Sequence, residues 1–384
     1  MLISKKNWAA VSFGDVAIQQ KGDIDRESEA VNRFVAGEHM ASEDLRIRQW
    51  GVLDGQYLGP AFRRKFEKGD ILYGSRRTYL KKVAVAEFAG ITANTTFVIK
   101  PNREKIFAGL LPFLMLSDSF TEHSIKHSKG SVNPYINWKD IASFTFKLPL
   151  MDEQERISKL LSSIGNVAES YIELLENMII FKNVYFDDKY EDKTSDLLSI
   201  SEIAEINPRL NQKDILSGTL ISFVAMADVS VEGRILQKAD RAYGEVKNGL
   251  TPFEEGDILF AKITPCMENG KGAIALSLTN RIGFGSTEFH ILRPKNSDDR
   301  DYLFYLTMMH SLRKKAEQLM TGSAGQKRVP SDFFDFYKVR FPKASKRKLI
   351  GQQMKSFDEK IADLKGNIAG AKAIQKQIIN QIFG

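Results

Sequence analysis

The sequence predicts an α+β fold in which a globular α/β domain occurs twice and each copy is followed by a long helix. Two observations predict this fold: short motifs recur at a nearly constant spacing, and a 3.5-residue apolar repeat follows each copy. The 384 residues suffice for several domains, and 43% hydrophobic with 27% charged residues is typical of folded proteins. We therefore expect two globular domains separated by two long antiparallel coiled-coil helices, with an internal pseudo-two-fold repeat.

The repeat is clearest where Phe66-Glu67-Lys68-Gly69-Asp70-Ile71-Leu72 matches Phe253-Glu254-Glu255-Gly256-Asp257-Ile258-Leu259 at an offset of 187 residues. At Pro101 and Pro294 the offset is 193, which indicates a six-residue insertion in the second copy. The predicted parts are a first domain at 1–150, a first helix at 151–190, a second domain at 191–343 and a second helix at 344–384.

Within the domains, β-branched and aromatic residues predict strands at 83–85, 96–99, 258–260 and 288–292. Clustered apolar residues predict helical segments at 105–128 and 299–320. The Gly-Asp pairs at 69–70 and 256–257 would turn the chain into buried strands, which is a structural role.

Both tails carry apolar residues at alternating steps of three and four, the pattern of a coiled-coil seam. The first seam comprises Ile157, Leu160, Ile164, Val167, Tyr171 and Leu174, and the second comprises Ile350, Phe357, Ile361, Leu364 and Ile368. Leu161, Ala168 and Leu175 lie beside the first seam, which predicts a wider buried face there. The simplest arrangement packs the two helices on each other, antiparallel.

The charge distribution favours a polyanionic partner. The net charge is +7, and residues 60–82 hold eight Lys or Arg against two acids. Such a local density of cations releases counterions from a phosphate backbone. A lone cysteine, Cys266, and the lack of a signal-peptide pattern predict a cytoplasmic protein, and no apolar run is long enough to indicate membrane association.

The motifs for catalysis are incomplete. Asn133-Pro134-Tyr135 lacks one proline of the Asn-Pro-Pro-Tyr signature of adenine-N6 methyltransferases, and no Gly-rich strand-turn-helix for S-adenosylmethionine accompanies it. Glu245-Val246-Lys247 lacks the acidic partner of a nuclease site, and His123 and His127 lack a zincin glutamate. The sequence therefore predicts no catalytic residue and no metal site in this chain.

With catalysis set aside, the function that the sequence favours is recognition of DNA. Arg and Lys can hydrogen-bond to guanine and phosphate, and Asn and Gln can hydrogen-bond to adenine. The alternative is that these side chains are solvated loop residues that bind nothing. The candidate contacts in the first copy are Arg63, Arg64, Arg76, Arg77, Tyr79, Lys81, Lys129, Ser131 and Asn133. Those in the second copy are Lys262, Thr264, Asn269, Lys271, Ser286, Thr287, Gln326, Lys327 and Arg328.

The chain resembles the DNA specificity subunit of type I restriction–modification systems over essentially its whole length. The motifs that carry the resemblance are Gly69-Asp70-Ile71-Leu72, Trp138-Lys139-Asp140-Ile141, Leu148-Pro149-Leu150, Glu153-Gln154-Glu155-Arg156-Ile157, Gly256-Asp257-Ile258-Leu259-Phe260-Ala261-Lys262-Ile263-Thr264-Pro265-Cys266, Glu268-Asn269-Gly270-Lys271 and Gly283-Phe284-Gly285-Ser286-Thr287-Glu288-Phe289-His290. The resemblance implies two target recognition domains that read the halves of an asymmetric, interrupted DNA site. It also implies that the helices set the spacer and dock two methyltransferase subunits.

By the same resemblance, S-adenosylmethionine is expected on the methyltransferase subunits, and ATP and Mg on restriction subunits that join the complex. This chain would then be non-catalytic and bind no cofactor. Two alternatives stay open at this point. The chain could serve a methylation-only or other effector complex, or it could be a stand-alone adenine-N6 DNA methyltransferase.

Overall fold

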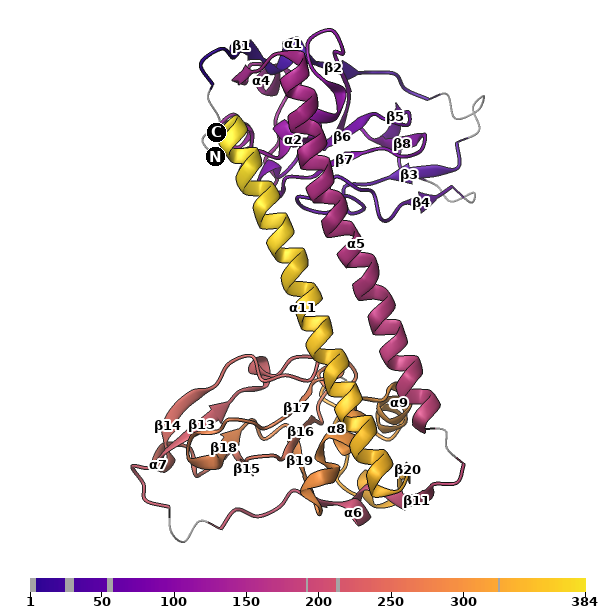
Figure 1. Ribbon diagram of the computed structural model, residues 1–384, viewed down its shortest axis with the longest axis vertical. Coiled ribbons are helices and arrows are strands. Elements are labelled where there is room, and N and C mark those ends of the chain that lie inside the picture. Colours follow the sequence, from indigo (N-terminus) through magenta and orange to yellow (C-terminus); the bar gives the residue numbers. More distant parts are fainter. Residues whose placement is uncertain (1–4, 25–30, 54–57, 191–192, 212–214, 324) are drawn as a thin grey trace. The chain divides into compact units, whose positions relative to one another are not determined.

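The computed structural model of the chain describes residues 5–24, 31–53, 58–190, 193–211, 215–323 and 325–384. The chain forms two compact units. Unit 1 comprises Met1–Leu174 and Leu364–Gly384, and unit 2 comprises Leu175–Asp363. The C-terminal end of the chain therefore belongs to the same unit as the N-terminal domain. In Figure 1, the yellow end of helix α11 lies beside the purple domain of unit 1.

The domain of unit 1 combines short strands with short helices. Its strands are β1 (Ala9–Ser12), β2 (Ala17–Gln20), β3 (Arg33–Val35), β4 (Gly51–Val52), β5 (Phe62–Phe66), β6 (Ile71–Gly74), β7 (Val83–Val85), β8 (Gly90–Ala93), β9 (Thr96–Pro101) and β10 (Thr145–Leu148). Its helices are α1 (Phe13–Val16), η1 (Thr78–Leu80), η2 (Ala108–Leu110), α2 (Leu111–Leu116), α3 (Asp118–Lys126) and α4 (Trp138–Ala142). The sheet orders are β1-β10, β2-β9-β6-β7 and β4-β3-β8-β5.

The domain of unit 2 contains the same kinds of element. Its strands are β11 (Asp196–Ser199), β12 (Ala204–Ile206), β13 (Leu220–Val224), β14 (Ala239–Ala242), β15 (Thr251–Glu254), β16 (Ile258–Ala261), β17 (Gly272–Ile274), β18 (Ile282–Gly285), β19 (Phe289–Pro294) and β20 (Lys338–Phe341). Its helices are α6 (Ile200–Ile203), η3 (Met226–Asp228), α7 (Tyr243–Val246), η4 (Thr279–Arg281), η5 (Ser297–Asp299), α8 (Arg300–Met308), α9 (His310–Gln318) and α10 (Phe333–Phe336). The sheet orders are β11-β20, β12-β19-β16-β17 and β14-β13-β18-β15.

The two domains share one topology, which confirms the predicted repeat. Each strand of unit 1 has a counterpart ten numbers later in unit 2, and the sheet orders correspond strand by strand. The pairs β3–β8 and β13–β18 are parallel, while the other strand pairs described are antiparallel. A duplicated sequence has therefore kept a mixed-sheet topology in both copies.

The repeated Gly-Asp turn has the structural role that the sequence predicts. Gly69 and Gly256 both have φ of +92°, a region that glycine enters without a Cβ penalty. The carboxylates of Asp70 and Asp257 each accept a hydrogen bond from the backbone N–H three residues earlier, at 2.8 and 2.7 Å. Each aspartate is buried, and each turn leads directly into the central strand β6 or β16.

The two predicted helical segments are each broken into separate helices. Ser117 interrupts 105–128 with an extended backbone, and its hydroxyl accepts from the N–H of Phe120 to cap α3. Met309, with φ −60° and ψ 133°, separates α8 from α9 in the same way. The prediction of helix was right in kind, but the apolar pattern did not reveal the break, because a single extended residue leaves the composition unchanged.

The long tails form helices α5 (Met151–Tyr190) and α11 (Ala344–Phe383), as predicted. In unit 2 the helices run antiparallel. The ring of Phe181 lies 5.5 Å from that of Phe357, whereas Phe186, further along α5, joins a core cluster with Ile350 and Met354. In unit 1 the end of α11 contributes Ile379, Ile382 and Phe383 to the domain core.

The predicted seam of α5 is wrong at three positions. Leu160, Val167 and Leu174 are 51%, 50% and 48% exposed, whereas Leu161 and Ala168 are buried. Neighbouring residues on a helix point about 100° apart, so packing on the domain core has rotated the buried face by one residue. The remaining seam positions of both helices are buried or half-buried: Ile157, Ile164, Tyr171, Ile350, Phe357, Ile361, Leu364 and Ile368.

Candidate nucleic-acid interface

In unit 1, two loops that are far apart in the sequence lie together. We call residues 75–82 and 128–136 the first loop pair. The N–H of Arg77 donates to the carbonyl of Pro134 at 2.7 Å, and the N–H of Ile136 donates to the carbonyl of Ser75 at 2.9 Å. Residues Lys129 and Tyr135 exchange backbone hydrogen bonds of 2.8 and 2.9 Å. The Arg76 guanidinium lies 5.9 Å from the centre of the Tyr135 ring.

In unit 2, the corresponding loops are joined in the same way. We call residues 262–271 with 321–323 and 325–329 the second loop pair. The N–H of Thr264 donates to the carbonyl of Lys327 at 3.0 Å, and the N–H of Val329 donates to the carbonyl of Lys262 at 2.9 Å. With the offsets of 187 and 193, these are the same two hydrogen bonds as in the first loop pair. The backbone of the site is therefore duplicated even though its side chains differ.

A third segment completes each loop pair. Residues 286–288 join the second pair, because the N–H of Lys262 donates to the carbonyl of Glu288 at 2.9 Å. The equivalent bond in unit 1 runs from the N–H of Ser75 to the carbonyl of Thr95 at 3.0 Å. The neighbouring Asn94 is exposed and stands at the position of Thr287. Reasoning from the sequence missed Asn94, although the offset of 193 residues maps Thr287 onto it.

Most predicted contact residues lie on the exposed surface of these loop pairs. The exposed members in unit 1 are Arg76, Arg77, Tyr79, Lys129, Ser131 and Asn133, and those in unit 2 are Asn269, Thr287, Gln326 and Lys327. The half-buried members in unit 2 are Lys262, Thr264, Lys271, Ser286 and Arg328. The structure thus gathers the candidates of each copy into one surface of cations and amides. The tripeptide Asn133-Pro134-Tyr135 lies within the first of these surfaces, where the carbonyl of Pro134 pairs with the backbone of Arg77.

Several predicted cations are paired with groups of their own domain. Arg63 and Arg64, on β5, each form an ion pair with Asp23 at 3.2 Å. Arg328 forms a two-point ion pair with Glu288 at 2.8 and 2.9 Å, and this arginine holds the pKa of Glu288 below its ordinary value. The ammonium of Lys271 donates to the carbonyl of Met226 at 2.9 Å. The contacts of Arg328 and Lys271 help to fix the second loop pair, and only the exposed atoms of these cations are free to contact a polyanion.

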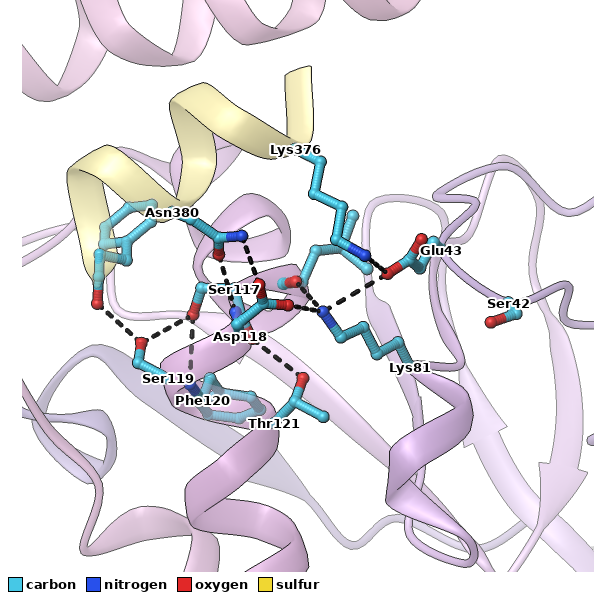
Figure 2. A network of polar contacts seen from close by, with 12 residues as sticks. Ser42, Glu43, Lys81, Ser117, Asp118, Ser119, Phe120, Thr121, Lys376 and Asn380 are labelled. Carbon is cyan, nitrogen blue, oxygen red and sulfur yellow. Dashed lines mark hydrogen bonds and ion pairs between the residues drawn. The ribbon is translucent and has the colours of Figure 1, made fainter. Parts of the chain in front are cut away.

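Lys81 requires a correction. Its side chain is 9% exposed, and its ammonium is paired with Asp118 and donates to the carbonyl of Leu116 at 3.2 Å. Figure 2 shows this nitrogen enclosed by carboxylate and carbonyl oxygens. A cation buried in this way stabilises the loop from inside and is not presented on its surface. In the sequence Lys81 is indistinguishable from its exposed neighbours, because its partner lies 37 residues away.

Arg313, on α9, is a functional candidate that sequence reasoning missed. It is 4% exposed, and it donates to the carbonyls of Met267 at 2.7 Å and Lys271 at 3.3 Å. Its guanidinium lies 4.7 Å from the centre of the Phe260 ring. Burial lowers its pKa to about 10, so the group is still charged at neutral pH. Arg313 therefore fixes the loop that presents Asn269.

Within the described residues, no group of three or more His, Cys, Asp and Glu side chains is arranged to hold a metal ion. In that same part of the chain, no helix is long and apolar enough to cross a membrane. The site consists of exposed basic and amide side chains on paired loops.

The fold and site define a duplicated α+β protein that presents two equivalent loop pairs and contains two long helices. The type I restriction modification DNA specificity domain matches residues 5–177 and again residues 193–372. The chain belongs to this family. The two matches coincide with the two copies of the repeat and confirm the resemblance drawn from the sequence.

Individual relatives are specificity subunits. The chain is 43% identical over 148 residues to the type I restriction enzyme EcoEI specificity subunit of Escherichia coli, which is 38% of this chain and 24% of that subunit. The match therefore spans about a quarter of that relative's length. The MjaVIII specificity subunit of Methanocaldococcus jannaschii is 22% identical over 414 aligned positions, covering 98% of this chain and 92% of the relative.

The fold also matches a solved structure. A chain solved in work on complex assembly and conformational transition of the type I R-M system has a TM-score of 0.59 and 18% identity. The match covers 98% of this chain and 96% of that one. At this identity the similarity supports the fold of the whole chain, and the role of the loops rests on their own geometry.

Proposed function

We propose that this chain is the DNA-binding specificity subunit of a type I restriction–modification complex, and that each loop pair reads one half of an asymmetric, interrupted DNA site. The observation that carries this proposal is a backbone repeated in both copies with different exposed side chains on it. The same pair of backbone hydrogen bonds holds Arg76, Arg77 and Asn133 in unit 1, and Gln326 and Lys327 in unit 2. A common scaffold with different polar side chains is suited to reading two different sequences.

The chemistry of the exposed side chains supports contact with double-stranded DNA. Arginine and lysine donate to guanine O6 and N7 or to phosphates, and asparagine and glutamine pair with adenine N6 and N7. Tyr79 and Tyr135, 53% and 41% exposed, add rigid rings beside the cations. A surface of this kind binds DNA with strong salt dependence, because each neutralised phosphate releases counterions.

The family and an exposed apolar stripe on α5 support the proposed partners. Leu160, Val167 and Leu174 are spaced by seven residues and are each about half exposed. Large apolar side chains repeated at heptad spacing are the surface that a partner helix covers. We propose that methyltransferase subunits dock on the long helices, bring S-adenosylmethionine and flip the target adenine out of the duplex. Restriction subunits with ATP and Mg join that core, and this chain performs no catalysis itself.

The test is sequencing-based mapping of N6-methyladenine in cells that carry this chain and its partner subunits. We expect methylation at one interrupted, asymmetric site. Exchanging residues 1–150 for the equivalent part of a relative should change one half of that site and leave the other half intact. A change in both halves would contradict the two-reader model. The matched control is the exchange of residues 191–343, which should change the opposite half.

A methylation assay with the purified chain alone distinguishes this proposal from a stand-alone adenine-N6 methyltransferase. We expect the chain to bind the mapped duplex and to leave it unmethylated when S-adenosylmethionine is added. Methylation by the chain alone, or crosslinking of S-adenosylmethionine to it, would overturn the assignment. A complex that methylates but does not cleave would identify a methylation-only system served by the same specificity chain.

A further inference from the structure

A polar network with half-exposed carboxylates joins the first loop pair to the C-terminal end of α11 within unit 1. Its centre is the ammonium of Lys81, which is paired with Asp118, donates to the carbonyl of Leu116 and lies 3.4 Å from Glu43. Figure 2 shows the two carboxylates on either side of this nitrogen.

Helix α11 binds the same two carboxylates. The ammonium of Lys376 lies 2.7 Å from Glu43. The side chain of Asn380 forms two hydrogen bonds with Asp118, accepting from its N–H at 2.8 Å and donating to its carboxylate at 2.6 Å. The network therefore connects one residue of the reading loop to the helix end through a shared pair of acids.

The loop segment next to this network is held in a strained conformation. Arg77 and Lys81 flank η1, and both have left-handed backbones, with φ of +48° and +47°. Residues other than glycine adopt this conformation only where their surroundings hold it. The carbonyl of Leu80 accepts from the hydroxyl of Ser42 at 2.6 Å, so the far end of η1 is also fixed. Arg76, Arg77 and Tyr79 are presented from this short, anchored segment.

We propose that Lys81 is a positioning residue for recognition of the half-site read by the first domain: it anchors the loop that presents Arg76, Arg77 and Tyr79 on the end of α11. This inference rests on the proposed function. Lys81 is buried between Asp118 and Glu43, so its role is internal. Asn380, in the same unit, contributes to the same anchor by binding Asp118. The hydrogen bond from Lys81 also holds the pKa of Asp118 below its ordinary value, so this carboxylate stays ionised at neutral pH.

Salt dependence separates positioning from direct contact. A lysine that neutralises one phosphate contributes about 0.9 to the slope of log K against log salt, and its removal lowers the slope by that amount. A positioning lysine contributes to affinity and to base discrimination, but its removal leaves the slope unchanged. A purely structural role would lower stability without relaxing one half-site selectively.

The experiment uses the assembled complex and duplexes that carry the mapped site, or that site with one half scrambled. We compare Lys81→Met and Asn380→Leu with Arg77→Ala and with Lys126→Met, which alters an exposed lysine of α3. Lys81→Met and Asn380→Leu should each reduce discrimination at the first half-site about tenfold, within the range of one good base contact. Discrimination at the second half-site and the salt slope should stay as in the parent. Because both side chains act through Asp118, the double variant should be little worse than either single variant.

A salt slope lowered by about 0.9 in Lys81→Met would make Lys81 a phosphate contact and overturn the proposal. Equal losses at both half-sites, or unchanged discrimination in both Lys81→Met and Asn380→Leu, would also overturn it. If Lys81→Met does not fold, Asn380→Leu decides, since it removes no charge. Arg77→Ala reports on the proposed function separately. If it and the scrambled duplexes change nothing, the DNA-reading assignment itself fails.

Discussion

The end of helix α11 is part of the core of unit 1, and a single substitution there tests this. Phe383 is 5% exposed, and its ring lies 6.2 Å from that of Phe146 on β10. Removing a buried phenylalanine side chain costs about 3–5 kcal/mol through lost burial and the cavity left behind. The hydrogen bond from the Ser119 hydroxyl to the Phe383 carbonyl, at 2.7 Å, survives in Phe383→Ala. The substitution thus isolates the contribution of the ring.

The chain provides its own probe for this measurement. Its three tryptophans, Trp8, Trp50 and Trp138, all belong to unit 1, so tryptophan fluorescence follows the unfolding of that unit. With a urea m-value of about 2–3 kcal/mol per M, Phe383→Ala should lower the fluorescence midpoint by roughly 1–2 M. The perturbation lies more than two hundred residues from the nearest tryptophan in sequence.

The matched control is Ile374→Ala, on the same helix and in the same unit. Ile374 is 53% exposed, and surface substitutions of this kind stay within about 0.5 kcal/mol. We expect its fluorescence midpoint to match that of the parent. If Phe383→Ala also matches the parent, the end of α11 does not belong to the core that surrounds the tryptophans, and the reasoning is refuted.

Three further predictions concern the second loop pair, the repeated turn and the long helices. Arg313→Met removes the hydrogen bonds from the guanidinium to the carbonyls of Thr307, Met267 and Lys271, at a cost of about 1–3 kcal/mol. It should relax the second half-site in a binding assay, whereas Lys314→Met, at the exposed neighbouring position, should not. Gly69→Ala and Gly256→Ala each force alanine to φ near +92°, at about 1–3 kcal/mol, and only the former should shift the tryptophan transition. Inserting four residues within 157–181 adds about 6 Å of helix, and methylation mapping should show a longer spacer, or no methylation if the complex does not assemble. An unchanged spacer would show that the helix does not set the spacer length.

The sequence predicted the features that depend on local pattern. The motif around Gly69 and Gly256, the four strands predicted at 83–85, 96–99, 258–260 and 288–292, and the two long helices are encoded in spacing and residue type over a few positions. Leu160 and Leu161 show the limit of such reasoning, since both are apolar and neighbouring, and only packing against the domain decides which is buried. The first loop pair shows another limit, because residues 75 and 136 meet through a backbone hydrogen bond that their side-chain types do not predict.

The two domains hold their reading loops with buried cations that are not equivalent. In unit 1 the cation is Lys81, within the loop itself, and its partners are carboxylates. In unit 2 it is Arg313, on α9, and its partners are backbone carbonyls of the loop. The anchors have diverged together with the loops, while the backbone hydrogen bonds between the loops have stayed the same. A loop moved alone from one domain to the other would therefore separate Lys81 from Asp118, or Arg313 from the carbonyls of Met267 and Lys271. For this reason we expect recognition to be exchangeable as a whole domain and not as a loop.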